Sequence, residues 1–237
     1  MRLSLAVGAI AIAGLALVGA AGPAYRLGAP LGSAFAIVRW GAYLSLGGAA
    51  LSLAAVWWGR RKGRTGAAVV AGLAVVIGVL TAAVAYGWLR QAQSAPPLHD
   101  VTTDLENPPS FETLARQRPE GSNPLTRSRD TDLLQQQHYP DLSPVTLKQP
   151  SRLVFDRARL VAENQGWTIV TSDPDAGRLE ATDSSFWFGF TDDIVIRLTP
   201  WGTGTRVDVR SVSRYGLTDT GTNARRISRF LGALQAP

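Results

Sequence analysis

Three long apolar segments open the chain, and none of them contains a charged residue. They cover residues 3–22, 40–58 and 66–89 and consist mainly of Ala, Gly, Leu and Val. A helix of about 20 apolar residues crosses the roughly 30 Å hydrocarbon core of a bilayer. Aromatic residues, typical of the membrane interface, stand near the ends of the second and third segments at Trp40, Trp57, Trp58, Tyr86 and Trp88. The pattern predicts three transmembrane helices.

From residue 143 onward the apolar positions follow shorter periods. A strand at 145–147 precedes a helix that begins at Ser151 and ends near Gly166, a natural helix terminator. Four more strands, separated by turn signals, are expected around residues 167–171, 178–183, 194–198 and 206–214. A last helix begins near Thr220 or Thr222 and carries the apolar stripe Ile227, Phe230, Leu231 and Leu234.

This order of elements predicts a fold class and a division into domains. Strands joined by short turns pair antiparallel, and two amphipathic helices can cover one face of their sheet. We therefore expect an α+β soluble domain, a small antiparallel sheet with two helices, preceded by three transmembrane helices. The anchor covers residues 1–89, a linker or arm covers 90–142, and the soluble domain covers 143–237.

The predicted arm is polar and interrupted by prolines, which prevent long helices. A short helix is expected over residues 109–117, and the rest should be an extended segment that lies on the domain or connects it to the membrane. The prolines of this region are Pro96, Pro97, Pro108, Pro109, Pro119, Pro124, Pro140, Pro144 and Pro150.

Charge is divided unevenly along the chain. Residues 1–89 contain seven basic residues and no acidic one, whereas residues 90–237 contain 17 basic and 18 acidic residues. The basic excess therefore lies between apolar segments and argues against nucleic-acid binding. Four cations stand in the second loop, at Arg60, Arg61, Lys62 and Arg64. Cytoplasmic loops are enriched in such residues, which predicts a multi-pass inner-membrane protein with a cytoplasmic N-terminus and residues 90–237 on the periplasmic side.

Two alternatives concern the apolar segments. The first segment has the short basic start and small-residue end of a cleaved signal peptide, although cleavage would leave the soluble domain on the same side. The helices could also form a transport pathway. No Asp, Glu, His or Lys interrupts them, and intramembrane ionisable residues usually mark such a pathway, so an anchor is favoured. Gly47, Gly48, Gly72 and Gly78 then indicate close helix packing.

Candidate catalytic residues are few. The chain has no cysteine and only two histidines, which excludes thiolate chemistry, and we expect neither a metal site nor a cofactor. His99 beside Asp100 and Asp104 could supply a general base, yet short polar side chains of this kind often bond their own backbone. Asp193 is a further candidate. Its neighbour Asp192 should point to the opposite sheet face, so that an arginine partner is the simpler role for Asp193.

Alternating charges on the last predicted strand form a second candidate site. They can pair across the sheet as an ion ladder, or arginines among them can bind an anion or a lipid headgroup. The residues are Arg206, Asp208, Arg210, Arg214 and Arg226. An aromatic cluster, Phe186, Trp187, Phe188 and Phe190, belongs to the core if it points inward and contacts lipid or a partner if it points outward.

Three motifs in the second half of the chain resemble those of the bacterial domain of unknown function 1499 family. They are HDVTTDLENPP at residues 99–109, FGFTDDIVIR at 188–197, and TRVDVRSVSR at 205–214, followed by Gly216, Asp219, Gly221, Asn223 and Arg226. The resemblance covers residues 98–234. The family is uncharacterised, so the resemblance implies the extent of a domain but no activity, and the helices rest on their own argument.

The residues favour a membrane-anchored envelope protein with a non-enzymatic binding or interaction domain outside the inner membrane. Its expected partners are the bilayer and a membrane or envelope component. A hydrolase of an envelope substrate is the first alternative, with His99, Asp100, Asp104 and Asp193 as its acid–base set. An accessory subunit, whose helices bind a larger membrane complex, is the second.

Overall fold

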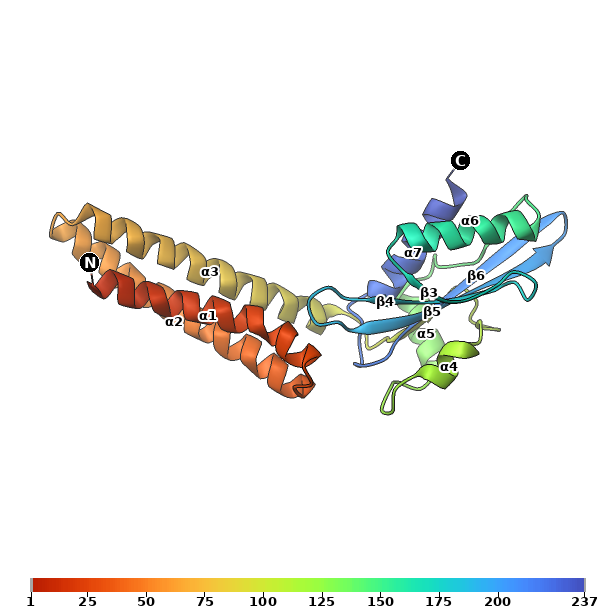
Figure 1. The fold of residues 1–237 in the computed structure, drawn as a ribbon, viewed down its shortest axis with the longest axis horizontal. Coiled ribbons are helices and arrows are strands. Elements are labelled where there is room, and N and C mark those ends of the chain that lie inside the picture. Colours follow the sequence, from red (N-terminus) through yellow and green to blue (C-terminus); the bar gives the residue numbers. More distant parts are fainter. Residues whose placement is uncertain (1, 237) are drawn as a thin grey trace. The chain divides into compact units, whose positions relative to one another are not determined.

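The computed structural model describes residues 2–236. Its contacts separate two compact units, one made of Met1–Gln93 with Phe186–Gly189 and the other of Ser94–Ser185 with Phe190–Pro237. The first unit contains the apolar helices and the second contains a β-sheet with its covering helices (Figure 1). Each unit is described by itself.

Three helices, α1 (Arg2–Arg26), α2 (Leu31–Arg61) and α3 (Thr65–Ser94), make up the first unit. All three are long and apolar enough to cross a membrane. They extend beyond the predicted apolar segments because helical hydrogen bonding continues past the hydrocarbon core. Arg39, expected in the first loop, therefore lies within α2, which starts directly after Pro30.

Small residues allow α1 and α2 to approach closely. A Cβ added to Gly48 would lie 2.7 Å from the backbone nitrogen of Ala11, whereas a Cβ on the adjacent Gly47 would meet nothing within 4 Å. Gly78 of α3 likewise faces the backbone of Ser45, while Gly72 faces open space. Two of the four glycines expected at helix contacts are therefore placed there.

Gly48→Val should separate α1 from α2 and lower the melting temperature of the full chain in detergent. Overpacking of this kind typically costs ~1–3 kcal/mol. Gly47→Val is the matched control, since it makes the same change one residue away with open space around it. Thermal unfolding of both variants beside the wild type tests this, and equal melting temperatures for the two variants would contradict it.

The second unit is built on a six-stranded antiparallel sheet of order β1-β6-β5-β4-β3, with β2 also paired to β6. The strands are β1 (Asp100–Thr102), β2 (Val145–Leu147), β3 (Thr168–Asp173), β4 (Arg178–Ser184), β5 (Thr191–Trp201) and β6 (Gly204–Ser213). The α+β fold class is confirmed. The sequence did not predict β1, whose three residues include a single apolar side chain, Val101.

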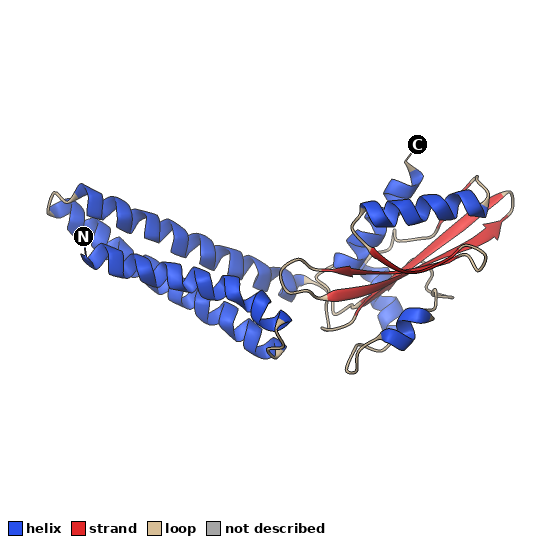
Figure 2. Cartoon of the chain, in the orientation of Figure 1, coloured by secondary structure: helices blue, strands red, loops and turns tan. Residues whose placement is uncertain are grey.

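Helices α6 (Ser151–Asn164) and α7 (Thr222–Gln235) cover one face of this sheet, and α4 (Thr113–Gln117) and α5 (Arg129–His138) lie on the other (Figures 1 and 2). The main core lies under α6 and α7. It includes the four apolar residues expected on the last helix, Ile227, Phe230, Leu231 and Leu234. Trp167 stacks on Phe230 there, with ring centroids 5.2 Å apart.

The proline-rich arm covers the opposite face. Besides β1 it forms α4 inside the expected helical segment, and it also forms α5, which the sequence analysis did not predict. No proline interrupts residues 125–139. Ser128 caps α5 by accepting a hydrogen bond from the Thr131 amide, and acidic residues in the first turn favour its N-terminus. That cap was the sequence signal for α5.

Candidate functional site

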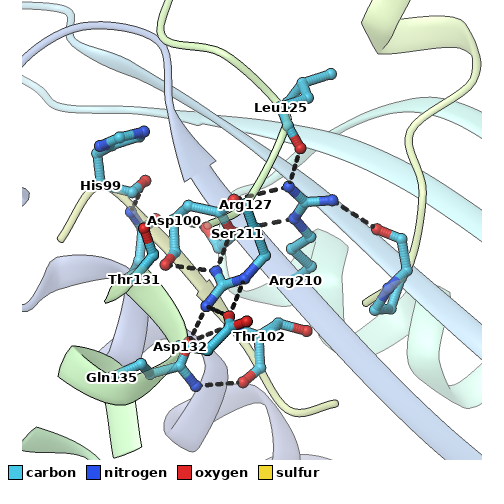
Figure 3. A network of polar contacts seen from close by, with 12 residues as sticks. His99, Asp100, Thr102, Leu125, Arg127, Thr131, Asp132, Gln135, Arg210 and Ser211 are labelled. Carbon is cyan, nitrogen blue, oxygen red and sulfur yellow. Dashed lines mark hydrogen bonds and ion pairs between the residues drawn. The ribbon is translucent and has the colours of Figure 1, made fainter. Parts of the chain in front are cut away.

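Asp100 stands at the centre of a buried ion cluster between β1, β6 and the arm (Figure 3). Its two carboxylate oxygens bind two different guanidinium groups. Arg210 Nη2 lies 2.7 Å from Oδ2, and Arg127 Nη1 lies 2.8 Å from Oδ1. Arg210 also donates to the carbonyls of Pro109 and Leu125. One strand residue thus holds three segments of the arm against the sheet.

Gln135 of α5 extends the same cluster. Its Nε2 donates to the Thr102 carbonyl at 2.6 Å, and its Oε1 accepts from the Thr102 amide at 3.1 Å. The side-chain amide therefore satisfies the free edge of β1 as a neighbouring strand would. Arg127 also donates to Gln135 Oε1 at 3.0 Å, which joins the amide to the ion cluster.

A second cluster holds the next part of the arm. Strand alternation places Asp192 and Asp193 on opposite faces of β5. The fully buried Asp193 accepts from Arg214 at 2.8 Å and from Arg118 of the arm. On the helix face, Asp192 accepts from Arg226 of α7 at 2.7 Å.

Two further clusters complete the polar framework. Arg197 and Arg206 each bind both Asp104 and Asp208, with separations of 2.9–3.1 Å. Arg226 binds Asp183 at 2.8 Å in addition to Asp192. Each of the nine residues singled out from the sequence, His99 excepted, therefore has an oppositely charged partner. The charged side chains of β6, the last predicted strand, point away from α6 and α7. The arm covers that face of the sheet, so Asp208 and Arg210 are buried.

The sequence analysis missed Glu180, which is fully buried in β4. Its carboxylate accepts the backbone amides of Glu112, Thr113 and Leu114, at 2.6, 3.2 and 2.7 Å. These are amides at the start of α4, which no preceding residue satisfies. Glu180 shares its face of β4 with Arg178 and Thr182, so the alternation of the strand gave no signal that this carboxylate is buried.

His99 is half-buried beside the first cluster, and its imidazole stands apart from the contacts drawn in Figure 3. No side chain among residues 2–236 hydrogen-bonds the ring. Burial is the main factor that lowers the pKa of His99, with Arg118 and Arg127 acting in the same direction against Asp100 and Asp219. A base for catalysis needs a partner that orients it, and both oxygens of Asp100 are already bound by arginines.

The lowered pKa of His99 predicts sensitivity to acid. The unfolded chain takes up a proton at its ordinary pKa of 6.5, whereas the folded domain resists protonation. The contribution of neutral His99 is therefore complete above that pH and decreases as the pH falls below it. His99→Gln should lose less stability than the wild type between about pH 7 and about pH 5.

Urea unfolding of the two full chains in detergent, measured at both pH values, tests this prediction. Burial raises the pKa of Asp219, against two backbone hydrogen bonds that lower it. Protonation of Asp219 therefore stabilises the fold as the pH falls, which is opposite in sign to the effect of His99. Asp219 is present in both proteins, so the difference between their changes in unfolding free energy reports His99 alone. Parallel pH profiles would contradict the role assigned to His99.

Asp219 terminates the loop before α7 in place of a conventional cap. Its carboxylate accepts from the Gly221 amide at 2.8 Å and the Asn223 amide at 2.5 Å. Thr220 and Gly221 both have positive φ, 57° and 78°, which turns the chain into the helix. Asn223 and Arg226 then converge on Ser211 of β6. Five of these residues belong to the third motif, so that part of the motif has a structural role.

No group suited to holding a metal occurs among the described residues. A cavity of about 240 Å³ opens beside the end of α5. It is lined by His138, Tyr139, Pro140, Asp141, Leu142, Ala224 and Ser228. None of the candidate residues from the sequence borders it. The charged candidates meet one another in ion pairs.

The sequence matches the model of a family described as a protein of unknown function, DUF1499, over residues 100–234. The chain belongs to the DUF1499 family. The match begins at Asp100 and ends in α7, so the DUF1499 domain includes the arm as well as the sheet and its helices. The resemblance noted in the motifs is thereby confirmed. A search of curated proteins finds none that matches the chain.

The motifs of the DUF1499 domain acquire a physical meaning in the structure. The first motif contributes Asp100 and Asp104, the second contributes Asp192 and Asp193, and the third contributes their arginine partners. The contacts of the first motif join residues 110 and 102 positions apart in the chain, whereas those of the second join residues 21 and 34 positions apart. Their arrangement can hold the arm on the sheet, because arginines bind all four of these carboxylates.

Proposed function

We propose that this protein is an envelope protein anchored in the inner membrane, whose DUF1499 domain binds a partner outside that membrane without catalysing a reaction. The observation that carries this proposal is the pairing of the catalytic candidates. Asp100, Asp104 and Asp193 each bind two arginines, and no side chain in the described part of the chain hydrogen-bonds the His99 ring. The three apolar helices and the basic loop at Arg60–Arg64 support the location.

The sidedness can be tested by cysteine labelling, because the natural chain contains no cysteine. Ala176→Cys lies in the exposed β3–β4 turn, and Thr65→Cys lies beside the basic loop. A membrane-impermeant maleimide should label Ala176→Cys in cells with a permeabilised outer membrane and an intact inner membrane. Thr65→Cys should react only after the inner membrane is opened. The reverse pattern would overturn the location.

Binding can be separated from hydrolysis by trapping in cells. We expect wild type and His99→Gln to cross-link to the same partner in similar yield, because a binding module does not consume what it holds. A hydrolase that uses His99 would instead retain its substrate on the His99→Gln variant, where the reaction is stopped. Mass spectrometry of the cross-linked full chain reads the result, and accumulation on the variant alone would favour the enzyme.

A further inference from the structure

Two large apolar side chains are exposed on neighbouring loops at one end of the sheet. Phe186 in the β4–β5 loop is 94% exposed, and Leu217 in the β6–α7 loop is 78% exposed. The strand register shows that both loops leave the same end. Ser184 pairs with Thr191 at the base of the first loop, and Asp192 pairs with Ser213 at the base of the second. We call Phe186 and Leu217 the apolar rim.

The chain enters the domain at this same end. Asp100, the first residue of β1, pairs with Val212, directly before the β6–α7 loop. The residues that precede β1 also bond this region: Ser213 donates to the His99 carbonyl at 2.8 Å, and Asp219 donates to the Leu98 carbonyl at 3.2 Å. The rim is therefore the end of the sheet at which the segment from the apolar helices arrives.

The length of that segment limits how far this end can move from the membrane. Helix α3 ends at Ser94 and β1 begins at Asp100. Six peptide steps, even fully extended, span only about 20 Å. The opposite end of the sheet is the β5–β6 turn around Thr203. It is separated from the rim by the full length of these two strands. Of the two ends, the one with the apolar rim is the one the covalent chain holds closest to a bilayer.

We propose that the apolar rim inserts into the interfacial layer of the bilayer that holds α3, so that the DUF1499 domain sits on lipid with a set orientation. Exposed Phe and Leu side chains gain free energy in that layer because they leave water. Arg225, exposed on the first turn of α7, donates to the Thr220 carbonyl and the Thr222 hydroxyl. Within residues 2–236 no carboxylate pairs with it, so its charge is available to a lipid phosphate.

This inference rests on the membrane anchoring in the proposed function but not on the side of the membrane. It also assigns Phe186, the exposed member of the aromatic cluster, to lipid and not to a protein partner, whereas Phe188 of the same cluster is buried. The alternative occupant, an apolar protein surface, gives a different result in the test below.

The test places an environment-sensitive fluorophore on the rim of the full chain. Leu217→Cys, which leaves Phe186 intact, and Thr203→Cys at the opposite end of the sheet are each labelled with NBD. Both proteins are reconstituted in phosphatidylcholine nanodiscs with and without doxyl-labelled lipid. We expect blue-shifted emission and loss of fluorescence to the doxyl lipid at position 217. At position 203 the emission should stay water-like and unquenched.

A second substitution checks that Phe186 acts with Leu217. Phe186→Ser in the Leu217→Cys background should reduce the lipid quenching. Leu153→Ser, which removes an apolar side chain on α6 that is 60% exposed, should leave it unchanged. Both sites are on the surface, so neither change should unfold the domain.

Three outcomes would overturn the proposal. Equal quenching at positions 217 and 203, or quenching at neither, would show no preferred contact of the rim with lipid. Protection of position 217 from aqueous iodide without quenching by doxyl lipid would show that a protein surface covers the rim. Cysteine labelling that reverses the sidedness would overturn the location proposed above and leave the lipid quenching intact, so the two failures are distinguishable.

Discussion

Asp100→Asn should lower the free energy of unfolding of the DUF1499 domain by about 3–5 kcal/mol, the usual cost of removing one member of a buried ion pair. The carboxylate neutralises two guanidinium groups that are almost fully buried, those of Arg127 and Arg210. An asparagine has nearly the same shape, but it leaves Arg210 without a counter-charge among the described residues and leaves Arg127 with only the partly exposed Asp132. The arm should loosen first, because Arg210 also holds the carbonyls of Pro109 and Leu125.

Pulse proteolysis of the full chain across a urea series in detergent measures this effect. Asp132→Asn is the matched control, because Asp132 binds the same Arg127 but is 30% exposed. Exposed ion pairs contribute only about 0–1 kcal/mol. Should the two variants unfold at the same urea concentration, Asp100 would not be the centre of the framework that we assign to it.

Glu180→Gln should destabilise the domain by about 1–3 kcal/mol for each buried donor that it leaves without an acceptor. The carboxylate presents one oxygen to the amides of Glu112 and Thr113 and the other to the amide of Leu114. A glutamine keeps one acceptor and puts an NH₂ group where the other was. At least one amide of α4 must then face a donor in a buried place.

Hydrogen exchange of the full chain locates this loss, with faster exchange expected in the peptide that covers α4. Glu112→Gln is the control, because Glu112 pairs with Arg178 on the same side of the sheet and is largely exposed. That substitution should change neither the exchange of α4 nor the urea midpoint appreciably. Unchanged exchange of α4 in Glu180→Gln would show that the carboxylate is not its N-terminal cap.

The elements with a long regular pattern were predictable from the residues. The three apolar helices, α6, α7 and the strands β3 to β6 follow from hydrophobic periods that each segment carries by itself, and the short β2 was predicted from the alternation of Val145, Thr146 and Leu147. The charges on β6 were also predictable as one face of a strand, because side chains alternate along it. What these charges bind was not predictable, because Asp100 and Asp104 lie about 100 residues before Arg206 and Arg210 in the chain.

The arm shows why the remaining features needed the tertiary structure. A strand of three residues such as β1 has no stability of its own, and its position comes from pairing with β6 and from Gln135 at its free edge. From the sequence Glu180 is indistinguishable from a solvent-facing residue of a polar strand face, and only the fold brings the amides of α4 to its carboxylate. The charges on β6 are buried in ion pairs only because the arm covers that face of the sheet.

The sequence by itself determined the membrane helices, the α+β class and the DUF1499 motifs, because apolar period, charge distribution and motif order are local properties. The tertiary structure alone decided that the candidate catalytic carboxylates bind arginines, and that Phe186 and Leu217 share one end of the sheet with the segment from α3. Such relations depend on strand register and on contacts between distant segments, and neither has a local signature.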